Sequence, residues 1–289
     1  MSVDFLGLEL AHPVINGSGT FDAIAARRAF GDALDERFPF SAFVSKTITL
    51  EPRAGNPPPR LWETPAGLIN SIGLPNKGLR GYLESDLPEL ARLPVPLITN
   101  VMGSTAAEVA ELVAAISERD EIAAIELNVS CPNVKTGLDI GADPASLAAF
   151  MREVRPHATK PLIVKLTPNT ADVALVAEAA EAEGADAVSL INTLRAMALT
   201  PGGEPWLGGG TGGLSGPAVF AVALAQVTAV ARRVAIPVVG MGGVRTARHA
   251  RDLLAAGATL VAVGTETFRD PLAGARIAAG LRSAPALTT

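Results

Sequence analysis

Short apolar runs alternate with longer amphipathic stretches along most of the chain. The apolar runs are rich in Val, Ile and Leu and lack the alternation of a half-exposed strand, which is typical of parallel strands buried on both faces. They predict strands at residues 14–16, 42–47, 97–100, 124–128, 162–166, 187–192, 237–240 and 260–263. The stretches between them have helical spacing and predict helices at residues 106–119, 144–155, 170–183, 217–233 and 247–256.

Residues at the ends of these segments support the same assignment. Thr105 and Asp143 are suitable N-caps, and Glu108 stands where a capping-box partner is expected. Gly184 and Gly257 follow their helices, where a left-handed residue is common. Strands that alternate with helices in this way predict an α/β fold, a (β/α)8 TIM barrel. No linker divides the chain, so we expect residues 1–289 to form a single domain.

Two connections, residues 48–77 and 194–215, are much longer than the others. They follow the second and sixth predicted strands, at the face where barrel enzymes carry their active sites. Long irregular loops in compact domains are usually lids or binding loops. We therefore expect both connections to border a site.

Composition narrows the class of protein. The chain is 48% hydrophobic and 18% charged with a net charge of −5, which favours a large aliphatic core. Without a basic stripe we expect no nucleic-acid partner. The N-terminus lacks the start of a signal peptide and no apolar run is long enough for a bilayer, so we expect a cytoplasmic protein without membrane contact. Cys131 is the only cysteine, which excludes an iron–sulfur cluster held by this chain alone.

Polar residues recur where the predicted strands end. Lys46, Asn100, Asn128, Lys165 and Asn192 stand at or near the carboxyl ends of different strands. Any one of them could be a structural polar group. Together they converge on one face of a barrel and predict an active site there.

The last two predicted strands lead instead into glycines, in Gly240-Met241-Gly242-Gly243 and Gly264-Thr265. Glycines at this place let backbone N–H groups approach a phosphate closely. Lys165 stands in an apolar interior run, where a lysine that reaches for solvent is unexpected. A fixed cation there would stabilise the negative charge of a reduced flavin.

Cys131 follows Asn128 by three residues, at the mouth of the predicted barrel. A free cysteine is more often an inert apolar residue than a catalyst. Its place between Asn128 and Asn133 favours catalysis, because a thiolate there could remove a proton from a substrate carbon while a flavin accepts hydride from the neighbouring carbon. We expect no metal in this chemistry.

Ordered motifs extend over essentially the whole chain, at residues 16–20, 46–53, 55–57, 70–76, 128–133, 164–169, 191–193, 212–217 and 240–243. In this order they resemble the class 1 dihydroorotate dehydrogenases, most of all the class 1B catalytic subunits. The resemblance implies an FMN-dependent oxidation of (S)-dihydroorotate to orotate in pyrimidine biosynthesis, with the flavin at the C-terminal face of the barrel. It also implies that Cys131 takes the C5 proton and that the flavin N5 takes the C6 hydride.

The resemblance assigns two further sets of residues. It implies that FMN is held by Ser18, Lys46, Thr47, Asn100, Asn128, Lys165, Ile191, Gly216, Gly242, Gly243, Gly264 and Thr265. It implies that the substrate is held by Lys46, Asn70, Ser71, Ile72, Gly73, Leu74, Asn128, Asn133, Asn192 and Thr193.

Residues 134–137, Val-Lys-Thr-Gly, resemble class 1B. That class passes electrons through a partner subunit with FAD and a 2Fe–2S iron–sulfur cluster to NAD, and relatives form homodimers and heterotetramers. A fumarate-using, class 1A-like enzyme is one alternative. Another is a related FMN enzyme for uracil-type pyrimidines, in which His-Gly stands in place of Asn133-Val134. A phosphate-binding isomerase or synthase without flavin and a non-catalytic flavoprotein are further alternatives.

Overall fold

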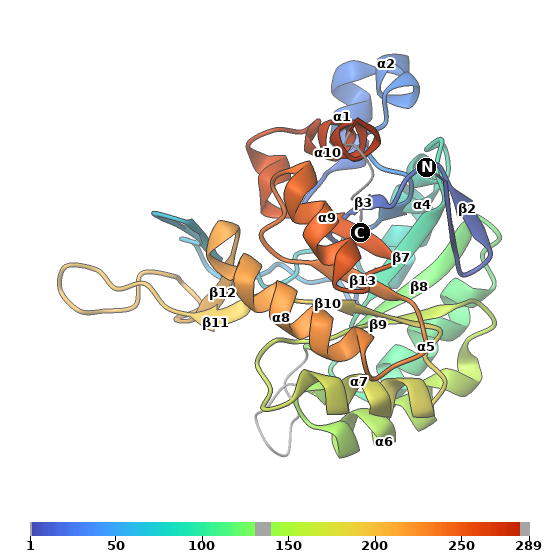
Figure 1. Ribbon diagram of the computed structural model, residues 1–289. Coiled ribbons are helices and arrows are strands. Elements are labelled where there is room, and N and C mark those ends of the chain that lie inside the picture. The colour runs from blue at the N-terminus through green and yellow to red at the C-terminus, as the bar shows by residue number, and fades with distance from the viewer. Residues whose placement is uncertain (1, 131–139, 284–289) are drawn as a thin grey trace.

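The computed structural model describes residues 2–130 and 140–283 of the chain. Its centre is a parallel sheet of eight strands curved into a barrel, as the sequence predicts (Figure 1). In order of pairing the strands are β3 (Val14–Asn16), β14 (Leu260–Val263), β13 (Val238–Met241), β10 (Ala187–Leu190), β9 (Leu162–Lys165), β8 (Ile122–Asn128), β7 (Leu97–Val101) and β4 (Phe43–Val44).

The barrel closes between β3 and β4 through the Asn16 side chain and, just before β4, through Ser41, whose N–H donates to the Val14 carbonyl at 3.0 Å. Asn16 is fully buried, its Nδ2 donates to the Val44 carbonyl at 2.8 Å, and the Val44 N–H donates to its Oδ1 at 2.8 Å. The amide therefore replaces a pair of backbone hydrogen bonds at the seam. A buried amide that satisfies two main-chain groups holds the first and last strands of the sheet together.

The barrel interior is apolar at the end away from the carboxyl ends of the strands. Ile15, Val44, Ile98, Ile163 and Leu260 meet there with other buried residues, and Phe5 and Leu10 pack against them. Phe5 and Leu10 come from an antiparallel hairpin of β1 (Val3–Phe5) and β2 (Leu8–Leu10), which covers this end. The closed apolar end leaves the opposite end of the strands for chemistry.

Helices surround the barrel and bury a second, larger apolar layer against the outside of the strands. The five predicted helices are confirmed, with small changes of boundary: α5 (Ala106–Ser117), α6 (Pro144–Val154), α7 (Val173–Ala182), α8 (Phe220–Ala231) and α9 (Ala247–Ala255). The sequence did not predict α1 (Ala23–Phe30), α2 (Asp32–Glu36), α3 (Gly78–Gly81), α4 (Leu87–Leu90) or α10 (Ala273–Arg282). Short helical turns complete the chain at η1 (Tyr82–Asp86), η2 (Ile140–Ala142), η3 (Arg155–His157), η4 (Pro217–Val219) and η5 (Thr265–Phe268).

The predicted N-caps and C-terminal glycines are confirmed, whereas the Glu108 carboxylate accepts from the Ser104 N–H at 2.7 Å instead of the Thr105 N–H of a capping box. The Thr105 side chain accepts from the Glu108 N–H, and the Asp143 side chain accepts from the Ser146 N–H. Gly184 and Gly257 have φ of +86° and +106°, which suits glycine. The helix predicted from residue 170 begins only at Val173, because Asp172 is its N-cap and accepts from two backbone N–H groups.

The second strand is shorter than predicted, because the chain bulges after Val44. The Ser45 N–H donates to the Ile98 carbonyl, and the next such bond runs from the Ile48 N–H to the Asn100 carbonyl. Three residues on one side thus span two on the other, which is the signature of a β-bulge. The Ser45 hydroxyl accepts from the Asn100 N–H in the gap. The bulge turns Lys46 and Thr47 out of regular strand geometry at the edge of the site.

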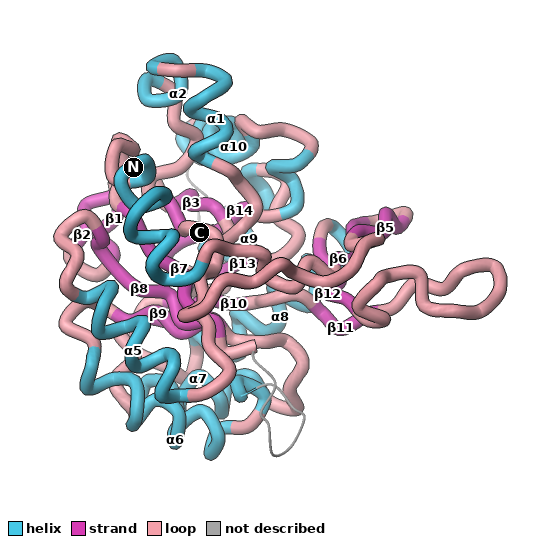
Figure 2. The backbone as a smooth tube through the Cα atoms, turned by 180° about the vertical axis from the view of Figure 1, so that it is seen from behind, coloured by secondary structure: helices cyan, strands magenta, loops and turns pink. Residues whose placement is uncertain are grey.

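The two long connections contain strands, so the expectation of irregular loops was wrong. They contribute β5 (Leu61–Thr64), β6 (Gly67–Asn70), β11 (Leu194–Ala196) and β12 (Gly212–Ser215). These strands pair in the antiparallel order β11-β12-β6-β5 and form a side sheet that projects from the barrel (Figure 2). Trp62 and Trp206 pack together on it, with ring centroids 4.8 Å apart. The pairing of β6 with β12 is non-local and therefore leaves no signal in either segment alone.

No helix within the described ranges is long and apolar enough to cross a membrane.

Candidate active site

Neighbouring strands place polar side chains at one level above the apolar half of the barrel. Asn128 is in register with Lys165, Lys165 with Ser189, and Asn100 with Glu126. Alternate residues of a strand share a face, so Glu126 and Asn128 lie on the same side of β8. The predicted convergence of Asn100, Asn128 and Lys165 at the strand ends is confirmed.

Lys46 and Lys165 form the cationic part of the site. Lys165 is only 7% exposed, whereas the Lys46 side chain is exposed and lines a cavity. Partial loss of hydration in this cavity, and next the charge of Lys165, lower the pKa of Lys46 below its ordinary value. Neither lysine forms an ion pair with a carboxylate in residues 2–130 or 140–283. Two close ammonium groups of this kind favour an anionic ligand.

Asn128, Ser130 and Asn192 form a small network beside the lysines. The Asn192 Nδ2 donates to the Ser130 Oγ at 2.8 Å and lies 3.3 Å from the Asn128 Oδ1. The Asn192 Oδ1 accepts from the Thr193 N–H at 2.9 Å. These contacts fix the chain immediately before Cys131. Cys131 and Asn133 themselves lie outside the described residues.

Glu126 is a site residue that the sequence analysis missed. It is 3% exposed, and its carboxylate accepts from the Asn100 Nδ2 at 2.5 Å and from the Ser189 Oγ at 3.0 Å. The Asn100 Oδ1 is buried and has no hydrogen-bond partner among the described atoms. A signal was present in the sequence, because Glu126 is a charged residue inside the apolar run 122–127 and two positions before Asn128.

The predicted substrate residues 70–74 begin with the last residue of β6 and are held by the other long connection and by Asn56. The Asn70 Nδ2 donates to the Gly213 carbonyl at 3.2 Å. The Asn56 Nδ2 donates to the Ser71 Oγ at 2.9 Å. Gly73 has φ of +74°, and a Cβ there would lie 2.4 Å from the Asn56 nitrogen. The side sheet therefore joins residues 70–74 to β12, and so to the barrel.

The glycine rim, Gly216, Gly242, Gly243 and Gly264, lies at the ends of the last strands. The first three have φ of +88°, +124° and +71°. A Cβ on Gly243 would lie 2.8 Å from both the Gly216 oxygen and the Phe220 Cβ. Gly216, Gly243 and Thr265 line a cleft of about 420 Å³, and the Thr265 Oγ1 donates to the Ser215 Oγ at 2.9 Å. Arg245 and Arg269 line the same cleft, together with Glu63 and Glu266. Arginines beside glycines whose backbone N–H groups a ligand can approach suit a phosphate.

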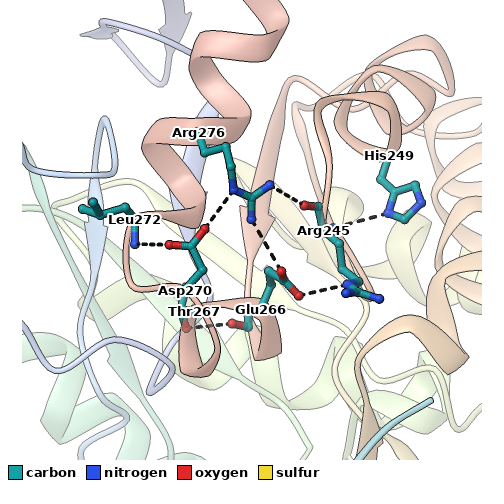
Figure 3. A network of polar contacts seen from close by, with 8 residues as sticks. Arg245, His249, Glu266, Thr267, Asp270, Leu272 and Arg276 are labelled. Atoms are coloured by element: carbon teal, nitrogen blue, oxygen red, sulfur yellow. Dashed lines mark hydrogen bonds and ion pairs between the residues drawn. The ribbon is translucent and has the colours of Figure 1, made fainter. Parts of the chain in front are cut away.

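Arginines and carboxylates brace this rim (Figure 3). Arg245 follows Gly243 by two residues and donates to Glu266 at 3.0 Å. Arg276 donates to Asp270 at 2.8 Å and to the Arg245 carbonyl at 3.0 Å, and it lies 3.5 Å from Glu266. The network connects the loop after β13 with the turn η5 after β14. It holds the two glycine-containing segments in fixed relative positions.

The remaining predicted residues lie around the same space. The Ser18 Oγ donates to the Ser45 carbonyl at 2.8 Å and is 3.4 Å from the Thr47 Oγ1. Ile191 is 3% exposed and packs beside Gly242, where a Cβ would lie 3.0 Å from its Cγ1. A largely apolar cavity of about 1160 Å³ opens beside Lys46, towards α1. No group of His, Cys, Asp and Glu side chains among the described residues could hold a metal ion.

Known proteins are similar in sequence to this chain over nearly its full length. The dihydroorotate dehydrogenase family profile matches residues 1–284. A protein of Pelobacter propionicus named dihydroorotate dehydrogenase B (NAD(+)), catalytic subunit, is 46% identical over 97% of this chain and 92% of its own length. Proteins with the same name from Citrifermentans bemidjiense and Bacillus pumilus are 46% and 44% identical over 96% and 94% of this chain, and over 90% and 87% of their own lengths. The chain belongs to the dihydroorotate dehydrogenase family.

Proposed function

We propose that residues 1–289 form a single catalytic domain that oxidises (S)-dihydroorotate to orotate in pyrimidine biosynthesis, with FMN as cofactor. The observation that carries the proposal is a pair of lysines, Lys46 and Lys165, at the strand ends of a family member, neither of which pairs with a carboxylate among the described residues. The same barrel carries a glycine rim that suits a phosphate. An FMN-binding site needs both parts, because its ligand carries charge at one end and gains charge at the other.

The residues present fit FMN. The glycine rim and Thr265 offer a cradle that side chains would fill, and the buried Asn100 Oδ1 has no partner in the described structure. In this proposal FMN is held by Ser18, Lys46, Thr47, Asn100, Asn128, Lys165, Ile191, Gly216, Gly242, Gly243, Gly264 and Thr265. When bound, FMN supplies an acceptor for a hydride. Lys165 then provides the fixed positive charge near the acceptor.

The substrate residues fit a small anionic ring with amide groups. Lys46 pairs with the carboxylate, and Asn128, Asn192 and Thr193 offer donors and acceptors to the ring. Asn133 and residues Asn70, Ser71, Ile72, Gly73 and Leu74 complete this set. Asn192 and Asn128 are already fixed by Ser130, so they hold one orientation before substrate arrives. Such preorganised contacts orient C5 and C6 of the ring for reaction.

Cys131 acts as the general base in this proposal. Its thiolate takes the proton from C5, while the hydride leaves C6, and a C5–C6 double bond forms in the product. Its neighbour Ser130 accepts from Asn192 and donates its N–H to the Asn128 Oδ1, so the loop leaves β8 in a fixed direction. The network thereby fixes Asn128 and Ser130, the latter being the last described residue before Cys131.

Electrons leave through a second subunit in this proposal. The relatives' name, catalytic subunit of an NAD(+) enzyme, supports a separate electron-transfer partner. The chain has a single cysteine, so the iron–sulfur cluster belongs to that partner, together with FAD. We propose a homodimer of this chain that associates with two such subunits, and NAD as the final acceptor.

The test is an anaerobic titration of FMN-loaded protein with dihydroorotate, in which the flavin absorbance is measured after each addition. We expect full bleaching by dihydroorotate and none by dihydrouracil. Cys131→Ala should keep FMN and slow bleaching by roughly 10²–10⁴-fold. Cys131→Ser should retain a trace of activity, since its hydroxyl has a similar position but a much higher pKa. Failure to bind FMN, or bleaching by dihydrouracil alone, would refute the proposed function, and a fully active Cys131→Ala would refute the assigned base.

A further inference from the structure

We propose that Glu126 is a positioning residue that sets the orientation of the Asn100 amide, so that the Asn100 oxygen faces the flavin and accepts its imide N–H. The inference rests on the proposed function, because it assumes that FMN occupies this face of the barrel. It adds a residue outside the predicted flavin and substrate sets.

The first step is the geometry of the carboxylate. Glu126 comes from β8 and reaches both ways around the barrel, to Asn100 on β7 at 2.5 Å and to Ser189 on β10 at 3.0 Å. All three residues are buried, with Glu126 3% exposed and the other two fully enclosed. Each carboxylate oxygen therefore has its own donor, and the side chain is held from two sides.

The second step is the chemistry of donor and acceptor. A carboxylate only accepts hydrogen bonds, whereas an amide has one accepting and one donating end. Glu126 therefore selects the rotamer of Asn100 whose nitrogen points towards it. The Asn100 oxygen must then point the other way. That oxygen is buried without a partner in the described part of the chain, which is a costly state for a polar atom.

The Asn100 oxygen limits which ligand group can face it. An unpaired carbonyl oxygen requires a donor, and neither a phosphate dianion nor a carboxylate has one. The oxidised isoalloxazine ring of FMN has a single N–H, at its imide nitrogen, between two carbonyl groups. Lys165 lies on β9, the strand between β8 and β10, and offers a cation to the same edge of a flavin. An acceptor for the N–H beside a donor for the carbonyl matches the alternation of that edge.

The Glu126 carboxylate could act on the flavin in two ways, through Asn100 or directly through its charge. A buried carboxylate also changes the electrostatic potential at the flavin, with or without Asn100. A role through Asn100 instead depends on an acceptor-only group that reaches Asn100, and on the presence of the amide. Two substitutions test these properties. Glu126→Gln keeps the length but removes the charge and introduces a donor end, and Glu126→Asp keeps the charge and the acceptors but shortens the reach.

The experiment measures the dissociation constant of FMN from the apoprotein by quenching of flavin fluorescence, in a double-mutant cycle. In the wild-type background we expect Glu126→Gln and Glu126→Asp each to weaken FMN binding by about 10-fold, as loss of a contact to a charged group does. In an Asn100→Ala background we expect each to change it by less than about 2-fold, because the coupled partner is absent. Ser189→Ala is the matched control; it removes the other donor and should cause a change of about 2-fold or less.

Each result decides whether Glu126 acts through Asn100. Equal losses in both backgrounds, or a loss with Gln but not with Asp, would show that Glu126 acts by charge or packing and overturn the inference. Unchanged FMN binding in both Glu126 variants would overturn it too. Either variant suffices if thermal unfolding shows that the other does not fold. Wild-type protein that does not bind FMN would instead refute the proposed function, which keeps the two failures distinct.

Discussion

The proposed flavin site has two ends that attract negative charge by different means. At the lysine end, two long side chains bring formal charges: Lys46 from the bulge after β4 and Lys165 from β9. At the glycine rim, Gly242, Gly243 and Gly264 bring backbone N–H groups and no side chains. The first end is partly enclosed and is cationic before any ligand arrives, while the second is a shape that a phosphate can enter.

The difference shows how one barrel can serve two kinds of charge. A phosphate has a fixed charge, so neutral dipoles in a tight cradle are sufficient to hold it. A reduced flavin gains its charge during the reaction, so a preorganised cation stabilises the product of hydride transfer more than the starting state. We therefore expect substitutions at the lysine end to alter reaction rates and substitutions at the glycine rim to alter cofactor affinity.

Lys165→Met is expected to have the largest effect on rate. Loss of one preorganised electrostatic contact typically costs roughly 10²–10³ in rate, so bleaching by dihydroorotate should slow by that factor while FMN stays bound. Stopped-flow absorbance measures it. Lys160→Met, which changes a lysine just before β9 at the other end of the strand, is the control and should be neutral. A Lys165 variant that bleaches at the wild-type rate would contradict the division between the two ends.

Gly243→Ala should act on affinity instead. The added Cβ meets the Gly216 oxygen and Phe220 at 2.8 Å and stands on a backbone with φ of +71°. Strain and overpacking together should weaken FMN binding by roughly 10–100-fold, while the rate of bleaching in saturated protein changes little. Gly210→Ala has a similar φ of +76° but no atom within 4 Å, so it separates strain from close contact. Equal losses in the two variants would mean that the cradle itself is unimportant.

The lysine end should also respond to pH. Only the protonated Lys46 pairs with a carboxylate, and enclosure and the charge of Lys165 lower the pKa of Lys46. Binding of orotate should therefore be constant at low pH and weaken with rising pH from a point below the usual lysine range, by up to about tenfold per pH unit. Equilibrium titrations of orotate at several pH values measure this. Lys46→Met should weaken binding and remove most of the dependence; a profile unchanged by this variant would assign the titration elsewhere.

Arg245→Gln should have the smallest effect. Arg245 lines the cleft at the glycine rim, but its charge is already shared with Glu266 and it is partly exposed. We expect FMN affinity to fall by about 3-fold at low salt and by less at high salt, as for other screened surface charges. Riboflavin, which lacks the phosphate, should bind equally well to variant and wild type. A matching loss for riboflavin would show that Arg245 acts only through the structure of the rim.

The barrel and the polar strand ends were predictable because both depend on local pattern. Each strand is a short apolar run, and Asn100, Asn128 and Lys165 interrupt such runs at their ends. The joining of the two segments in the side sheet was not predictable in the same way, because β6 pairs with β12 across about half of the chain. The bulge after β4 was missed for a similar reason, since it exists only relative to β7. Glu126 was overlooked because its partners, Asn100 and Ser189, come from other strands.

The side sheet has a consequence for the order of folding. The contact between Asn70 and Gly213 closes a loop of 143 residues, which contains much of the barrel. Chain entropy opposes such a closure until the strands between the two segments are in place. We therefore expect residues 70–74 to reach their final positions late, after the barrel wall has formed. A nascent or partly folded chain would then have a flavin face before it had a complete substrate pocket.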